Sequence, residues 1–124
     1  MKKVFYSLFC AFALCTCTTV NGSQNFYGAQ AAQIVSGAQQ IVSSDYSTIP
    51  DMIIFEESKQ PGFGDPELWI RLTFGMDKDY GLKMLSVEPD LIGFTHYRYQ
   101  QTLNGHPMDG TMWLVHVKNN KVVS

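Results

Sequence analysis

The chain has 124 residues, enough for one domain, and its 16% charged residues leave a formal net charge of −2 at pH 7. This acidic balance argues against nucleic acid as a partner, because nucleic-acid-binding proteins carry basic patches that contact phosphates. Beyond residue 22 no apolar stretch is long enough to cross a membrane.

The first 22 residues are expected to be an export leader. Lys2 and Lys3 form a basic start, and the apolar run Val4–Cys15 that follows is too short to span a bilayer. We therefore predict a signal peptide over residues 1–22 and an exported, secreted protein. A lipobox ending at Cys17 is the alternative, and acylation there would anchor the protein at the cell envelope.

The three cysteines, Cys10, Cys15 and Cys17, all lie in this leader. The mature domain, predicted over residues 23–124, therefore has no thiol for a disulfide, a metal or a nucleophile. Without disulfides an exported domain of about a hundred residues depends on a packed core. Loss of Lys2 and Lys3 leaves 9 − 2 = 7 basic residues against 11 acidic ones, a net charge of −4.

The first half of the mature chain is predicted to contain short elements. Polarity makes residues 23–28 a linker, and Gly37 interrupts a run of apolar residues at helical spacing. We expect a short helix or coil up to Ser36 and a strand over residues 38–43. A connection over residues 45–50 leads to a buried strand of Met52 to Phe55, and glycine and proline predict a loop over residues 57–64.

A helix is expected to begin at Asp65. Aspartate is a good N-cap, proline fits the first helical position and an acidic residue suits the first turn. Leu68, Trp69 and Leu72 follow at the spacing of one apolar helix face, with Met76 as a further candidate, and Gly75 is expected to end the helix.

The remaining chain alternates strands with strong turn signals. We predict strands over residues 82–87, 94–102, 111–117 and from 121 onward, separated by turns at Pro89-Asp90, Asn104-Gly105 and Asn119-Asn120. The aromatic side chains of this region are expected to build a core. The order of elements predicts an α+β fold, an antiparallel meander sheet with one helix packed on a face.

One stretch of this last region also resembles a known module. The pattern D-x-x-G-x-T-H-x-R-x-Q-Q-x-x-x-G-x-P begins at Asp90 and is followed by an apolar strand that ends in V-H-V-K. It resembles the FTP motif, the fungalysin/thermolysin propeptide segment of secreted thermolysin-like zinc metallopeptidase precursors. The resemblance is tight from Asp90 to Ser124 and looser back to about Gly37.

The resemblance implies a set of signature positions: Gly93, His96, Arg98, Gln101, Gly105, Pro107 and His116. We favour a structural role for Arg98, because a guanidinium presents several donors that can tie loops and carbonyls together. The alternative is that the Arg98 face docks onto the peptidase.

Residues that could carry chemistry are few. His96, His106 and His116 are spaced by ten residues, which matches no compact ligand motif even with Asp109 as a fourth ligand, so no metal site is predicted. His96 and His116 are expected to lie on paired strands and hydrogen-bond within the sheet. There is no G-x-S-x-G elbow and no mature cysteine, so no catalytic residue is identified. The resemblance places zinc only in a catalytic domain that this chain lacks.

The resemblance implies a propeptide module whose partners are a metallopeptidase catalytic domain and a neighbouring pro-domain. Such a module assists folding of the peptidase and keeps it inactive until cleavage. Edge strands over residues 111–117 and 121–124 are candidate docking surfaces. The end at Ser124 looks like a strand cut short, as in the front part of a zinc metalloendopeptidase precursor. The alternative is a free-standing binding or inhibitor protein of the cell envelope.

Overall fold

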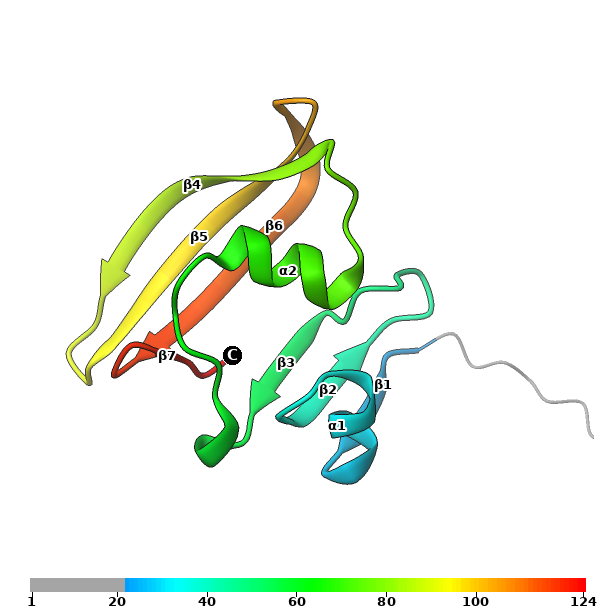
Figure 1. The fold of residues 1–124 in the computed structure, drawn as a ribbon, viewed down its shortest axis with the longest axis vertical. Helices are drawn as coiled ribbons and strands as arrows, with labels where there is room; N and C mark the ends of the chain where they lie inside the picture. The colour runs from blue at the N-terminus through cyan, green and yellow to red at the C-terminus, as the bar shows by residue number, and fades with distance from the viewer. Residues whose placement is uncertain (1–21) are drawn as a thin grey trace, which may run out of the picture.

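The computed structural model describes residues 22–124, which form two antiparallel sheets, two short α-helices and one 3₁₀ turn (Figure 1). The predicted leader, apart from Gly22, and the lipidation candidate Cys17 lie outside the described residues. Within residues 22–124 no helix is long and apolar enough to cross a membrane.

The first sheet has the order β1-β2-β3, with β1 at Gln24–Tyr27, β2 at Ala38–Ser43 and β3 at Met52–Phe55. Helix α1 (Ala29–Ile34) connects β1 to β2. A short helix or coil followed by a strand was predicted for this stretch. The linker predicted for residues 23–28 was wrong, because Gln24–Tyr27 pairs with β2. The polar side chains of β1 face solvent along the edge of the first sheet. The sequence of this strand is therefore as polar as that of a linker.

Gly37 occupies the turn between α1 and β2 for two physical reasons. Its φ of 82° lies in the left-handed region, where a side chain is strained. A Cβ at this position would also lie only 2.8 Å from the backbone oxygen of Lys59. Lys59 belongs to the 3₁₀ turn Glu57–Lys59, which forms part of the predicted loop. The glycine therefore allows this loop to pack closely against the start of β2.

Helix α2 (Pro66–Phe74) begins and ends where the sequence predicts. The Asp65 carboxylate accepts a hydrogen bond from the Leu68 amide at 3.0 Å, and Gly75 closes the helix with a left-handed φ of 65°. The predicted apolar face was right for Trp69, which packs against the first core cluster, and wrong for the two leucines. Leu68 and Leu72 are 50% and 76% exposed, whereas Ile70 is 2% exposed. The two sheets around α2 decide which face is buried, and the helical spacing of leucines does not.

The second sheet has the order β4-β5-β6-β7. Its strands are β4 (Tyr80–Pro89), β5 (Phe94–Leu103), β6 (His106–Lys118) and β7 (Lys121–Val122). They include the predicted strands, and β4 and β6 are longer than predicted. Asn104 and Gly105 have φ values of 50° and 80°, and Asn119 and Asn120 have 51° and 59°, which confirms both predicted tight turns.

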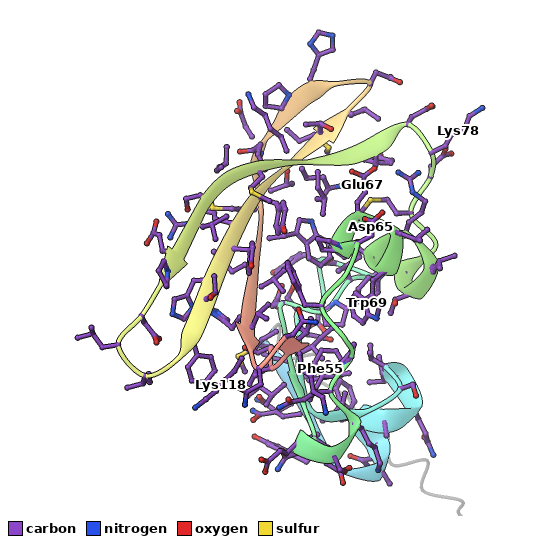
Figure 2. All side chains as sticks on the ribbon, turned by 60° about the vertical axis from the view of Figure 1, so that its left-hand side comes forward. Phe55, Asp65, Glu67, Trp69, Lys78 and Lys118 are labelled. Atoms are coloured by element: carbon purple, nitrogen blue, oxygen red, sulfur yellow. The ribbon has the colours of Figure 1, made fainter. Side chains whose placement is uncertain are left out.

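Each sheet contributes its own cluster of buried side chains. The larger cluster comprises Ala31, Val35, Ala38, Ile41 and Phe55, and the smaller one comprises Tyr99, Val115 and Val117. An aromatic series joins them from β3 through α2 to β6. The ring centroids of Phe55 and Trp69 lie 5.9 Å apart, those of Trp69 and Phe74 5.9 Å, and those of Phe74 and Trp113 6.0 Å. Figure 2 shows Phe55 and Trp69 between α2 and the first sheet.

The α+β class and the antiparallel order are therefore confirmed. The strands form two sheets instead of one meander, and α1 is a helix additional to the one predicted over the sheet. The 3₁₀ turn and α2 separate β3 from β4 along the chain. The two sheets form separate strand ladders, which meet through side chains of α2 and through the hydrogen bond from the Phe55 amide to the Val123 carbonyl.

Candidate functional site

The turn between β4 and β5 is built around the Asp90 carboxylate. Its Oδ1 atom accepts hydrogen bonds from the amides of Ile92 and Phe94, both at 2.9 Å, and the Asp90 amide donates to the Phe94 carbonyl at 2.8 Å. Gly93 sits inside this turn with a φ of 90°, which favours glycine. The turn thereby fixes the second oxygen of Asp90 at the start of β5.

This second carboxylate oxygen starts a chain of polar contacts across the sheet. Asp90 Oδ2 lies 3.0 Å from His96 Nε2, and His96 Nδ1 lies 2.5 Å from His116 Nδ1. His96 and His116 are directly opposite each other in the β5–β6 pairing, so their rings share one face of the sheet. The prediction that these two histidines hydrogen-bond within the sheet is confirmed.

The protonation state of this series follows from its geometry. An ionised carboxylate only accepts, so His96 Nε2 donates to Asp90, and one of the two rings donates to the other across the Nδ1–Nδ1 contact. Burial lowers the pKa of His116, and the neighbouring His96 lowers it further. Burial raises the pKa of Asp90, but hydrogen bonds from Phe94, His96 and Ile92 outweigh this effect and lower that pKa overall. Two charged rings would instead place two N–H groups against each other.

The other signature residues do not join this series. Arg98 is exposed, and within residues 22–124 its side chain makes no hydrogen bond or ion pair. The hydrogen bonds predicted for its guanidinium are therefore absent from the described part of the chain. Gln101 accepts a hydrogen bond from Trp113 Nε1 at 3.1 Å, and Gly105 and Pro107 lie at and beside the β5–β6 turn.

His106 is exposed at the start of β6, away from the other two histidines. Among the described residues no group of three histidine, cysteine, aspartate or glutamate side chains is arranged to hold a metal ion.

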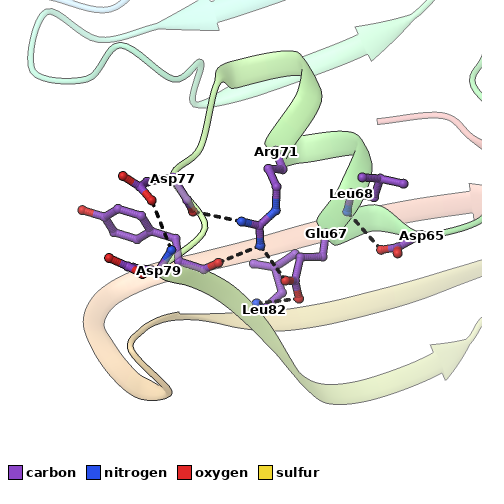
Figure 3. Close-up of polar contacts among 8 residues, drawn as sticks. Asp65, Glu67, Leu68, Arg71, Asp77, Asp79 and Leu82 are labelled. Atoms are coloured by element: carbon purple, nitrogen blue, oxygen red, sulfur yellow. Dashed lines mark hydrogen bonds and ion pairs between the residues drawn. The ribbon is translucent and has the colours of Figure 1, made fainter.

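Sequence reasoning missed two sets of polar contacts that fix the second sheet. Gln100 Nε2 donates to the carbonyls of Met108 and Thr111, and so ties β5 to an irregular part of β6. Arg71 donates to the carbonyls of Asp77 and Tyr80 and to the carboxylate of Glu67, as Figure 3 shows. The i, i+4 spacing of Glu67 and Arg71 is a sequence signal for their pairing.

Comparison with known families identifies the second sheet. Residues 80–124 match the family model described as the Fungalysin/Thermolysin Propeptide Motif. The match runs from β4 through β7 and includes every predicted signature position, so the resemblance stated for Asp90 to Ser124 is confirmed and extends back to Tyr80. No curated protein and no solved structure matches the chain.

The matched residues carry a motif that belongs to precursors of secreted thermolysin-family metallopeptidases. The first sheet lies outside the match, and so does the looser resemblance from Gly37 to Asp79.

Proposed function

We propose that this protein assists the folding of an exported thermolysin-like metallopeptidase and keeps it inactive until the propeptide is removed. The observation that carries the proposal is the propeptide motif over residues 80–124, which forms the whole second sheet. A domain that binds the native-like peptidase better than the unfolded one shifts the folding equilibrium by mass action. Within one precursor the effective concentration is high, so weak contacts suffice.

The free guanidinium of Arg98 supports docking through the outer face of the second sheet. Arg98 lies opposite Leu114 on β6, which is 51% exposed, and Met112 on the same strand is 54% exposed. Exposed apolar side chains around an unpaired cation are typical of a protein interface, where arginine is enriched and lysine depleted. The pattern fits a peptidase catalytic domain or a neighbouring pro-domain as the partner.

The proposal is tested by refolding. A denatured thermolysin-like catalytic domain is diluted from urea with and without the protein, and the regained peptidase activity is measured after the propeptide is digested away. We expect a several-fold higher yield with the protein, and inhibition when the protein is added to the active enzyme. Equal yields with and without the protein would contradict assistance in folding.

A matched pair of variants tests the docking face. Arg98→Ala is expected to lower the refolding yield several-fold, whereas Lys78→Ala, at an exposed basic residue in the loop between α2 and β4, is expected to leave it unchanged. Both variants are expected to melt as the wild type does, because neither side chain has a hydrogen bond within the described residues. An equal loss of yield in both variants would indicate general electrostatics in place of a specific contact.

A free-standing inhibitor of the cell envelope is the second candidate. Each sheet has its own cluster of buried side chains within residues 22–124, which favours a domain that can act on a separate peptidase molecule. Inhibition of the active enzyme without any effect on its refolding would favour this candidate, and acylation of Cys17 would be checked by mass spectrometry of the exported protein.

A further inference from the structure

Strand β4 forms one edge of the second sheet, on the side away from β7 (Figure 1). It is ten residues long and pairs with β5 alone, so its other edge has no neighbouring strand in the part of the chain that the structure describes. Met84, Leu85 and Val87 on this strand are 53%, 48% and 45% exposed. An edge strand presents free N–H and C=O groups to which a further strand can bond.

Side chains of α2 already occupy the first part of this edge. Arg71 donates to the Tyr80 carbonyl at 2.9 Å, and the Leu82 amide donates to the Glu67 carboxylate at 3.2 Å (Figure 3). Backbone groups point alternately to the two sides of a strand, so those of Met84 face the same edge as those of Tyr80 and Leu82. The free amides of the edge therefore begin at Met84.

A β-bulge changes the pattern in the middle of β4. Tyr99 and Arg98 are neighbours on β5, whereas their partners Met84 and Ser86 are two residues apart, so Leu85 is an additional residue.

The bulge places two pairs of β4 side chains on common faces. Met84 and Val87 lie opposite Tyr99 and Tyr97, which are two positions apart on β5. The side chains of Met84 and Val87 therefore share one face of the sheet, and their backbone groups both point to the free edge. By the same alternation Lys83 and Glu88, opposite Gln100 and His96, share the other face.

This arrangement makes the edge complementary to itself when two copies of β4 lie antiparallel. In one register Met84 lies opposite Val87 of the second copy, and Lys83 lies opposite Glu88 of the second copy. A twofold axis repeats both contacts, which gives two apolar pairs on one face and two ion pairs on the other. Directly opposite residues of antiparallel strands are close enough for such contacts.

The ends of the contact also match. In this register Pro89 of one copy lies opposite Leu82 of the other. Pro89 has no N–H to donate, and the Leu82 amide is already bonded to Glu67. Pairing therefore stops where the side chains of α2 begin, and no free amide is covered without a partner at that point.

The bulge selects a second copy as the occupant of the edge. It inserts an additional residue between Met84 and Val87, so their free groups do not match the two-residue repeat of a regular strand. A strand with the same bulge at the same place has the matching spacing. Lysine, proline and bulges protect an edge against indiscriminate pairing, and here they leave a second β4 as the strand that fits.

We propose that residues 83–88 of β4 form an interface between two copies of this chain, which pair antiparallel about a twofold axis perpendicular to the sheet. Two four-stranded sheets then become one continuous sheet. The axis places Arg98 of both copies on the same side, so the dimer presents two outer faces next to each other. The contact is small compared with a standard protein interface, so we expect a weak dimer.

Charge reversal tests the register. Lys83→Glu and Glu88→Lys each place like charges opposite each other twice, and each is expected to weaken the dimer at least tenfold. The double variant restores both ion pairs and is expected to associate as the wild type does, as is an equal mixture of the two single variants. Lys121→Glu, at an exposed residue of β7, is the control and should associate normally. Sedimentation velocity from micromolar to millimolar protein measures all of them.

Hydrogen exchange tests the pairing in the wild type. NMR follows the backbone amides in dilute and in millimolar protein. The amides of Met84 and Val87 are expected to exchange at least tenfold more slowly at the high concentration. The Leu82 amide, which is bonded to Glu67 in each copy, should change little. If a charge variant melts below the wild type, this measurement decides the question.

Three results would overturn the proposal. One is a protein that stays monomeric at millimolar concentration. Another is a dimer that both single charge reversals leave intact. The third is slower exchange confined to amides outside residues 83–88, which would place the interface on another surface. The inference does not depend on a peptidase, and the refolding assay does not depend on a dimer, so each proposal can fail without the other.

Discussion

The two sheets of this domain share an antiparallel order but are stabilised in different ways. The first has short strands, the longest of six residues, and a cluster that includes Ala31 and Ile41 at 0% exposure. The second has strands of up to thirteen residues but only three buried hydrophobic residues, each more exposed than those two. Packing against α1 and α2 therefore stabilises the first sheet, whereas hydrogen-bond ladders and polar side chains account for more of the second.

The difference in burial leaves more apolar and charged side chains exposed on the second sheet. A sheet that needs few buried side chains can expose apolar and charged residues on its outer face, as the second sheet does at Met112, Leu114 and Arg98. The propeptide motif falls on this second sheet. Under the proposed function, the first sheet and the helices supply the packed scaffold, and the second sheet supplies the surface for a partner.

The largest effect is expected from a cavity in the first sheet. Ile41→Ala removes a fully buried side chain and should cost about 2–5 kcal/mol of unfolding free energy, because the neighbours relax only partly into the space. The matched deletion in the second sheet, Leu114→Ala at a half-exposed position, should cost less than about 1 kcal/mol. Urea unfolding followed by circular dichroism measures both, and similar costs would refute the difference in packing.

A smaller effect is expected where α2 is tied to β4. Arg71→Ala removes the side-chain donor to the Asp77 and Tyr80 carbonyls and to Glu67 Oε1, which should cost about 1–3 kcal/mol. Glu67 Oε2 keeps the Leu82 amide as a donor, and the Asp77 carbonyl keeps the Tyr80 amide. The control is Lys59→Ala, which removes an exposed ion pair with Glu56 and should change the melting temperature little. If both variants melt alike, the Arg71 contacts do not position α2.

The next largest loss of stability is expected from a substitution in the turn between β5 and β6. Gly105→Val forces a β-branched residue to a φ of 80°, at a cost of about 1–2 kcal/mol. Gly64→Val is the control, because Gly64 lies outside the left-handed region and a Cβ there meets no atom within 4 Å. Thermal denaturation of the two variants compares them. An unchanged melting temperature for Gly105→Val would contradict the turn geometry.

The smallest effect should come from mild acid, which acts on the second sheet because all three histidines lie there. The pKa of His116 is lowered on folding, so the unfolded chain binds more protons as the pH falls. The contribution of His116 is complete above its ordinary pKa of 6.5 and is lost as the pH falls through the folded value.

Urea unfolding at pH 7 and pH 5 tests this sign. The wild type should lose stability between the two conditions, His116→Gln should lose less, and the exposed control His106→Gln should behave as the wild type. A gain in stability at pH 5 would mean that the His96–His116 pair prefers the charged state. The lowered pKa of Asp90 adds a further loss only below its ordinary value of 3.8.

Much of the local structure could be predicted because its causes are local. The Asp65 cap, the glycine that ends α2 and the two asparagine-containing turns each depend on a few neighbouring residues. The pairing of His96 with His116 followed from alternation along two strands joined by one turn. The buried face of α2 could not be predicted, because Ile70 is buried by contacts that a periodicity of leucines does not encode.

The sequence by itself determined most of the elements, their antiparallel order and the tight turns, since propensity, alternation and turn chemistry act over a few residues. Only the tertiary structure decided that the strands divide into two sheets, that Arg98 has no partner within residues 22–124, and that β3 and β6 face each other across a cleft. The physical reason is distance along the chain: these features depend on contacts between residues dozens of positions apart, and no local pattern records which edges meet.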